Sequence, residues 1–145
     1  MLFRSPRLML AMLISVVIPA FNEEGYLGET LASLNRAKAF LQRERGLQAE
    51  IIVVDNDSDD ATADVARALG ATVARETPHN VAKVRNTGAK LSKGATIVFV
   101  DADTVVPDNL LSRIVDAMSD DTCFGGAVDT EIGRASCRER VYSSV

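Results

Sequence analysis

The sequence has few cysteines and no extended run of basic residues, and both absences narrow the range of functions. Cys123 and Cys137 are its two cysteines, and they have neither a CxxC pattern nor the spacing of metal ligands. We therefore expect a reducing compartment and no structural disulfide. The net charge is -4 and no cluster of lysines and arginines occurs. That composition argues against a nucleic-acid-binding surface.

Long apolar runs are missing as well. The apolar stretch 8–18 is too short to span a bilayer as a helix. Two arginines precede it, as in a signal peptide, but the stretch leads directly into a polar motif. We therefore interpret 13–18 as a buried first strand and 1–12 as an N-terminal extension, with Met9 or Met12 as alternative start sites. A cytoplasmic location is expected for the chain, and membrane association of a longer parent protein is left open.

The segment 132–145 differs from the rest of the chain. It shows no apolar periodicity, and the string EIGRASCRERV resembles the in-frame translation of a sequencing-library adapter. We interpret 132–145 as a non-native tail that replaces the natural sequence, with a genuine polar terminus as the alternative. Residues 13–131 then form one truncated domain, which is long enough to bury a core.

Apolar, β-branched runs alternate with segments of helical periodicity along this domain. The expected strands are 13–18, 51–54, 71–74, 97–100 and 123–128. The first expected helix starts just after Asn22, which we expect to cap it, and the second starts after Asp59 or Asp60, either of which can cap it. A third starts near Ala82 and a fourth after Pro107. The first helix has an apolar face formed by Leu27, Leu31, Leu34 and Leu41, and the second has one formed by Val65, Ala66 and Leu69, with Gly70 at its end. This alternation predicts an α/β fold, an open and mostly parallel sheet with helices on both faces.

Polar clusters follow three of the expected strands. They are PAFNEE at 19–24, DNDSDDAT at 55–62 and DADT at 101–104. Because ligands of such sheets bind at the carboxyl ends of the strands, we expect the clusters to meet at one edge. An Asp after a strand is often only a turn or cap residue. Several carboxylates at one edge, however, repel each other unless a cation joins them, and a divalent metal carrying a phosphate is a natural candidate.

The combination of VVIPAFNEE, IIVVDNDSDDAT, VRNTGA and IVFVDADTVVP resembles family 2 glycosyltransferases of the GT-A fold over about residues 13–128. The resemblance implies an inverting, metal-dependent enzyme. Such an enzyme transfers a sugar from a nucleotide-diphosphate sugar donor to an acceptor, which the sequence does not identify. It also implies that Mg²⁺ or Mn²⁺ binds at the site, since both prefer hard oxygen ligands.

The same resemblance implies roles for residues that follow the first two strands. In the motif that starts at Pro19, Phe21 stands where the family places an aromatic residue near the nucleotide base. Glu23 matches an acidic residue near the ribose. Asp55 matches the residue that accepts a hydrogen bond from the base, and Asp57 is a weaker substrate-binding candidate.

Further roles are implied for residues of the third and fourth motifs. Arg85 belongs to an Arg-Asn-x-Gly segment at a helix start, where a cation suits a diphosphate. Asp101 and Asp103 match the DxD motif, in which the second carboxylate binds the metal directly and the first contacts the ribose, or the metal through water. The metal would neutralise the leaving diphosphate as a Lewis acid. His79 and Lys83, which lie nearby, are expected to be incidental.

Two other functions fit part of the sequence. Asp101 and Asp103 also fit the hhhDxDx[TV] pattern of haloacid-dehalogenase-like phosphatases, as nucleophile and general acid/base, but that interpretation leaves PAFNEE and VRNTGA unexplained. The second alternative is a catalytically inactive nucleotide-binding fragment. An inverting transferase needs a general base, which the family places well downstream of its DxD motif. Asp129 and Glu131 follow too soon to match, so no catalytic base is identified and this chain is expected to lack one.

Overall fold

The computed structural model describes residues 13–119, 126–129 and 134–137. The expected extension 1–12 lies outside the described residues, as do most residues of the expected tail 132–145. The chain divides into two compact units, which are described separately. The first unit comprises Met1–Ala32 and Leu47–Val105, and the second comprises Ser33–Gly46 and Val106–Val145.

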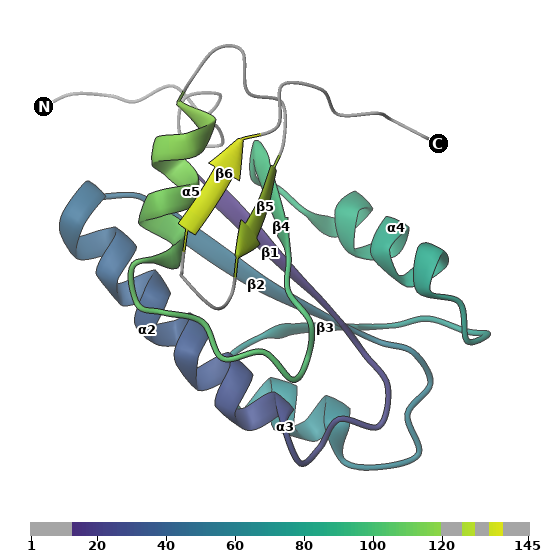
Figure 1. Ribbon diagram of the computed structural model, residues 1–145. Coiled ribbons are helices and arrows are strands. Elements are labelled where there is room, and N and C mark those ends of the chain that lie inside the picture. The colour runs from purple at the N-terminus through teal and green to yellow at the C-terminus, as the bar shows by residue number, and fades with distance from the viewer. Residues whose placement is uncertain (1–12, 120–125, 130–133, 138–145) are drawn as a thin grey trace, which may run out of the picture. The chain divides into compact units, whose positions relative to one another are not determined.

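The first unit is built on a four-stranded parallel sheet with the strand order β3-β2-β1-β4 (Figure 1). Its strands are β1 (Leu13–Ala20), β2 (Gln48–Asp55), β3 (Thr72–Arg75) and β4 (Thr96–Phe99). The chain proceeds outward from β1 to β3 and then returns to the other side of β1 to form β4. The strand order therefore reverses between β1 and β4, which is where open α/β sheets bind their ligands. The four expected parallel strands are confirmed.

Two helices of the first unit cover the sheet. Helix α3 (Thr62–Ala68) packs on β2 and β3, and α4 (Val81–Leu91) packs on β1 and β2. Figure 1 shows these two helices on opposite sides of the sheet. Helix α2 (Leu27–Arg45) begins in this unit and continues into the second. Helices on both faces require strands that are apolar throughout, which explains the continuous apolar runs in β1 and β2.

The contact between α4 and the sheet is close. Val84 of α4 is buried in a cluster with Val17 of β1 and with Ile52 and Val54 of β2. At Gly88, an added Cβ atom would lie 2.2 Å from Cγ1 of Val17. A glycine is therefore needed at this position, because any side chain would push α4 away from β1.

The second unit contains α5 (Leu110–Met118) and an antiparallel hairpin of β5 (Gly126–Asp129) and β6 (Arg134–Cys137). Helix α5 contacts β6. An ion pair of 2.6 Å joins Arg45 to Asp116. The strand expected over 123–128 thus appears as β5 in a separate two-stranded sheet, not in the parallel one. Its apolar composition could not distinguish these two pairings.

Of two expectations about helix α2, one is confirmed and the other is wrong. The predicted apolar face of α2 is confirmed, because Leu27, Leu31, Leu34 and Leu41 are all fully buried. The prediction that Asn22 caps this helix is wrong. Asn22 has a φ of 51°, and its Oδ1 accepts a hydrogen bond of 2.9 Å from the N–H of Asp59. The N–H of Leu27, the first residue of α2, instead donates to the carbonyl of Glu23 at 2.9 Å.

Two apolar residues of the first unit are more exposed than their sequence pattern suggests. Leu69 is 37% exposed because α3 ends at Ala68 and Gly70, with a φ of 82°, turns the chain away. Phe99 is 44% exposed, since β4 is an edge strand of the sheet. In the part of the chain that the structure describes, no helix is long and apolar enough to cross a membrane.

Candidate functional site

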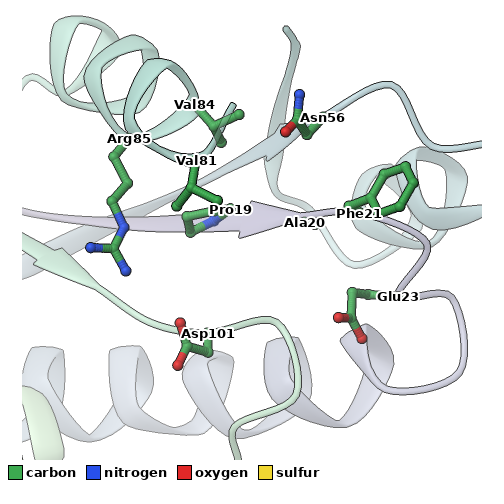
Figure 2. Close-up of a pocket in the computed structure, with 9 residues that line it drawn as sticks. All are labelled: Pro19, Ala20, Phe21, Glu23, Asn56, Val81, Val84, Arg85 and Asp101. Atoms are coloured by element: carbon green, nitrogen blue, oxygen red, sulfur yellow. The ribbon is translucent and has the colours of Figure 1, made fainter. Parts of the chain in front are cut away.

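A cleft of about 300 Å³ opens at the carboxyl ends of β1 and β4, where the strand order reverses. Its lining residues are Pro19, Ala20, Phe21, Glu23, Asn56, Val81, Val84, Arg85 and Asp101. Figure 2 shows Arg85 reaching down from α4 towards Asp101, with Glu23 and Phe21 at the far end of β1. The structure therefore brings five of the predicted site residues to one cleft.

The acidic triplet 101–103 forms a turn just beyond β4. The N–H of Val100 makes the last bond to β1, donating to the carbonyl of Val17 at 3.0 Å, and the N–H of Thr104 donates to the carbonyl of Asp101 at 3.2 Å. Asp101 and Asp103 are exposed, whereas Ala102 between them is buried. Among the described residues, none gives either carboxylate a hydrogen bond or an ion pair. Both carboxylates are thus available to a ligand.

Negative charges gather around this turn. Burial raises the pKa of the Glu23 carboxyl above its ordinary value, and the charges of Asp103 and then Asp60 raise it further. The carboxylates that follow β1 and β4 therefore lie close enough for their negative charges to repel each other. A cation in that space would relieve their repulsion.

The positive side of the cleft is Arg85. Its guanidinium carbon lies 5.6 Å from the ring centroid of Phe99, in a cation–π contact. No described acidic residue pairs with it. The nearby Lys83 differs, because its Nζ lies 3.0 Å from a carboxylate oxygen of Glu76. Among the described residues, Arg85 is therefore a cation that lines the cleft and has no acidic partner.

The loops after β1 and β2 are interlocked. Five hydrogen bonds join backbone N–H groups of one loop to side chains of the other. For example, the N–H of Asn22 donates to Oγ of Ser58 at 2.9 Å, and the N–H of Ala61 donates to Glu24 at 3.1 Å. Asp60 also accepts a bond of 2.9 Å from the N–H of Thr62, the first residue of α3. The N-cap position of α3 is nevertheless Ala61, which makes no side-chain cap bond, so the expectation that Asp59 or Asp60 is the cap residue is wrong by at least one position.

Asp55 and Asp57 do not line the cleft. Asp55 is buried, and its Oδ1 accepts a bond of 3.2 Å from the N–H of Ser58. Asp57 has a φ of 64° and is paired with the guanidinium of Arg75. The hydrogen bond from Arg75 lowers the pKa of the Asp57 carboxyl. The structure gives both residues local structural contacts, and their contact with a nucleotide stays a prediction.

Sequence reasoning missed Asn56, which lies between these two aspartates and does line the cleft. Its buried Nδ2 donates to the carbonyls of Glu76 and Pro78 at 3.0 and 3.1 Å, and its Oδ1 accepts from the N–H of Asn80 at 3.1 Å. The segment held in this way carries His79, whose ring centroid is 4.2 Å from that of Phe21. The position of Asn56 after a strand was the only signal in the sequence, because the partners of Asn56 lie some twenty residues further along the chain.

The arrangement of cleft, acidic turn and helix start can be compared with known proteins. Residues 15–140 match the family described as glycosyl transferase family 2. The chain belongs to this family. The resemblance seen in the sequence is therefore confirmed, whereas the predicted domain boundaries stay predictions.

Proteins similar to this chain include a 4,4'-diaponeurosporenoate glycosyltransferase of Staphylococcus haemolyticus, 37% identical over 100 residues, which are 62% of this chain and 24% of that protein. A mannosyltransferase of Pyrobaculum calidifontis, solved with GDP-Man and Mn²⁺, superimposes with a TM-score of 0.68 and 26% identity over 80% of this chain and 34% of that one. TarS 1–349 of S. aureus, solved with UDP-GlcNAc, superimposes with a TM-score of 0.58 and 28% sequence identity over 73% of this chain and 31% of that one.

These likenesses confirm the GT-A fold, and the chain spans about a quarter to a third of the length of these relatives. Among the residues that the structure describes, no group of three or more His, Cys, Asp or Glu side chains is arranged to hold a metal ion.

Proposed function

We propose that the parent protein transfers a sugar from a nucleotide-diphosphate sugar to an acceptor with inversion, and that this chain forms the donor site. The observation that carries the proposal is the pairing of charges across the cleft. On one side lies the free carboxylate of Asp101 and on the other lies the guanidinium of Arg85. Asp103 does not line the cleft itself, but it is exposed two residues further along the same turn, and its charge acts on Glu23, which does line the cleft. A diphosphate accompanied by a divalent cation complements both sides, since it presents a metal to the acids and oxygen atoms to the arginine.

The described residues fit a divalent metal. Two exposed carboxylates on one turn supply hard oxygen ligands, which suit Mg²⁺ or Mn²⁺. Ions of this kind are commonly held by one or two carboxylates, with substrate phosphates and water completing the shell, so two carboxylates among the described residues are a suitable number. We assign direct binding to Asp103 and contact with the ribose, or with the metal through water, to Asp101. When bound, the metal would stabilise the charge that develops on the leaving diphosphate.

The rest of the donor extends along the cleft from this turn. Arg85, near the beginning of α4, would hold the diphosphate, because helix starts and guanidinium groups both favour phosphate oxygens. Glu23 would lie near the ribose and Phe21, with its partly exposed ring, near the base. The similar structures hold UDP-GlcNAc and GDP-Man, so both bases are candidates. The sugar and the acceptor are not assigned.

We further propose that this chain binds the donor without completing the transfer. Deprotonation of the acceptor hydroxyl needs a general base, and we assign that role to no described residue. The side chain of Asp129 and all of Glu131 lie outside the described residues. The family match favours a glycosyltransferase over the phosphatase alternative, since it accounts for PAFNEE and VRNTGA as well as for the acidic triplet.

Calorimetry tests the donor site. The purified chain is titrated with UDP and with GDP, each with and without Mn²⁺. We expect binding that depends on Mn²⁺ and that Asp103→Asn weakens by about tenfold or more. Asp116→Asn, which removes an exposed carboxylate of the second unit, should leave the affinity unchanged. Arg85→Gln should weaken binding more than Lys83→Gln, because Lys83 already has an acidic partner. A folded chain that binds neither nucleotide in the presence of Mn²⁺ would contradict the proposal.

A further inference from the structure

The backbone of the acidic turn is held by a side chain that no sequence motif indicates. Thr30 of α2 is fully buried, and its hydroxyl donates a hydrogen bond of 2.8 Å to the carbonyl of Ala102. The same hydroxyl lies 3.4 Å from the carbonyl of Tyr26, one turn earlier in the helix. The shorter contact therefore connects α2 to the centre of the triplet 101–103, which is 72 residues away in sequence.

This bond satisfies a carbonyl that the rest of the turn leaves without a partner. The sheet ends with the bond from Val100, and the turn is closed through the carbonyl of Asp101. Neither bond uses the carbonyl of Ala102, a residue that is only 4% exposed. A buried carbonyl without a donor is unfavourable. The hydroxyl of Thr30 thus removes the main reason for this peptide to rotate towards water.

The orientation of that peptide matters for Asp103. The carbonyl of Ala102 and the N–H of Asp103 belong to the same rigid peptide plane. When Thr30 fixes the carbonyl, it also fixes the position of the Asp103 Cα atom, from which the carboxylate side chain extends. A ligand whose attachment point is fixed before the metal arrives binds that metal more tightly, because less freedom is lost on binding.

We propose that Thr30 is a positioning residue for the metal-binding carboxylate of Asp103. This inference rests on the proposed function, since it assumes that Asp103 binds a divalent cation together with the nucleotide. Thr30 touches neither the metal nor the donor. It acts through the Ala102–Asp103 peptide, and its loss loosens the carboxylate without removing it.

Two substitutions isolate the hydroxyl in the full chain. Thr30→Val removes the hydroxyl but keeps the branched shape, and Thr30→Ser keeps the hydroxyl. Mn²⁺ affinity is measured by calorimetry in the presence of UDP or GDP, whichever the wild-type chain binds, and the spectrum of bound Mn²⁺ is measured by electron paramagnetic resonance. We expect Thr30→Val to weaken Mn²⁺ binding by about tenfold, as the loss of groups that orient a metal ligand commonly does. Thr30→Ser should restore the affinity and the wild-type Mn²⁺ spectrum.

Ser33→Ala is the matched control. Ser33 is a buried residue of the same helix, and its Oγ accepts a bond of 3.1 Å from the N–H of Val106. This variant should lower thermal stability and leave Mn²⁺ affinity unchanged. If Ser33→Ala weakens Mn²⁺ binding as much as Thr30→Val, general loosening explains both effects and the inference is wrong. Thr30→Ala replaces Thr30→Val in the comparison if the valine variant does not fold.

The outcomes separate this inference from the proposed function. Tight Mn²⁺ binding by the wild-type chain and by Thr30→Val alike overturns the role of Thr30 alone. A wild-type chain without Mn²⁺-dependent UDP or GDP binding overturns the proposed function, and the role of Thr30 with it. Mn²⁺ binding that Thr30→Val weakens and Thr30→Ser restores supports both.

Discussion

Substituting Gly88 by alanine sets two opposing effects against each other at the contact between α4 and β1. Alanine is the better helix former, by about 1 kcal/mol relative to glycine in a helix interior. Its Cβ, however, would lie 2.2 Å from Cγ1 of Val17 and 3.3 Å from two further atoms of the same side chain. Val17 is fully buried and its β-branched side chain has little rotational freedom. The overlap therefore has to be relieved by moving the helix.

Overpacking of this kind costs about 1–3 kcal/mol net in well-packed cores. Because the methyl group would lie so far inside contact distance, we expect the overlap to exceed the gain in helix propensity. Gly88→Ala should then lower the free energy of unfolding by about 1–3 kcal/mol. For a chain of this size, that corresponds to a melting temperature lower by roughly 3–10 °C. Thermal and urea unfolding followed by circular dichroism measure both quantities.

The control is Gly28→Ala in α2. There the nearest atom to an added Cβ is 4.0 Å away, so we expect only the favourable helix effect, a stabilisation of up to about 1 kcal/mol. A second control combines Gly88→Ala with Val17→Ala, which removes the methyl groups that overlap; the two changes should be less destabilising together than their sum. If Gly88→Ala is as stable as the wild type, the close packing of α4 on β1 is refuted.

Two further predictions concern the loops around the cleft. Asn56→Ala should lower the free energy of unfolding by about 1–3 kcal/mol, because it removes three hydrogen bonds between this buried side chain and the backbone of Glu76, Pro78 and Asn80. It should also weaken nucleotide binding in calorimetry by displacing His79 from Phe21. Unchanged stability would count against this role. The pair of Asp57 and Arg75 should stabilise the fold at neutral pH. Since the folded pKa of Asp57 is lowered, its contribution is present above the ordinary pKa of an aspartate and is lost as the pH falls through the lowered value. Arg75→Ala should therefore reduce the loss of unfolding free energy that occurs as the pH is lowered. Urea unfolding at a series of pH values measures this loss, and a pH dependence identical to that of the wild type would exclude such a contribution.

Part of the site could be predicted from sequence because it depends on local pattern. The apolar runs before Phe21 and Asp101 predict strands, and residues that follow parallel strands meet at one edge of a sheet. The segment around Arg85 has helical periodicity and belongs to α4, as expected. These predictions use only neighbouring residues and the general geometry of α/β sheets, so they do not depend on a particular packing.

The predictions that failed depend on contacts with distant residues. Asn22 is of a residue type that commonly caps helices, but its side chain accepts a hydrogen bond from the loop after β2 instead. The apolar run before Asp129 is compatible with either a parallel or an antiparallel partner, and only the fold places it beside β6. The surroundings of Asp57 depend on a distant residue too, because it follows a strand as Asp101 does but pairs with Arg75, whereas Asp101 lines the cleft. Contact between Asp57 and a nucleotide stays a prediction.

The sequence by itself determined the alternating α/β architecture, the strand ends that carry the polar clusters and the likeness to family 2 glycosyltransferases. The tertiary structure decided which of those polar residues share a cleft, and which buried side chains hold them there. Thr30 and Asn56 show the physical reason. The hydroxyl of Thr30 and the side-chain amide of Asn56 bond to backbone groups that the fold brings within 3.1 Å. No local sequence pattern predicts these contacts, because the partners are distant in the chain.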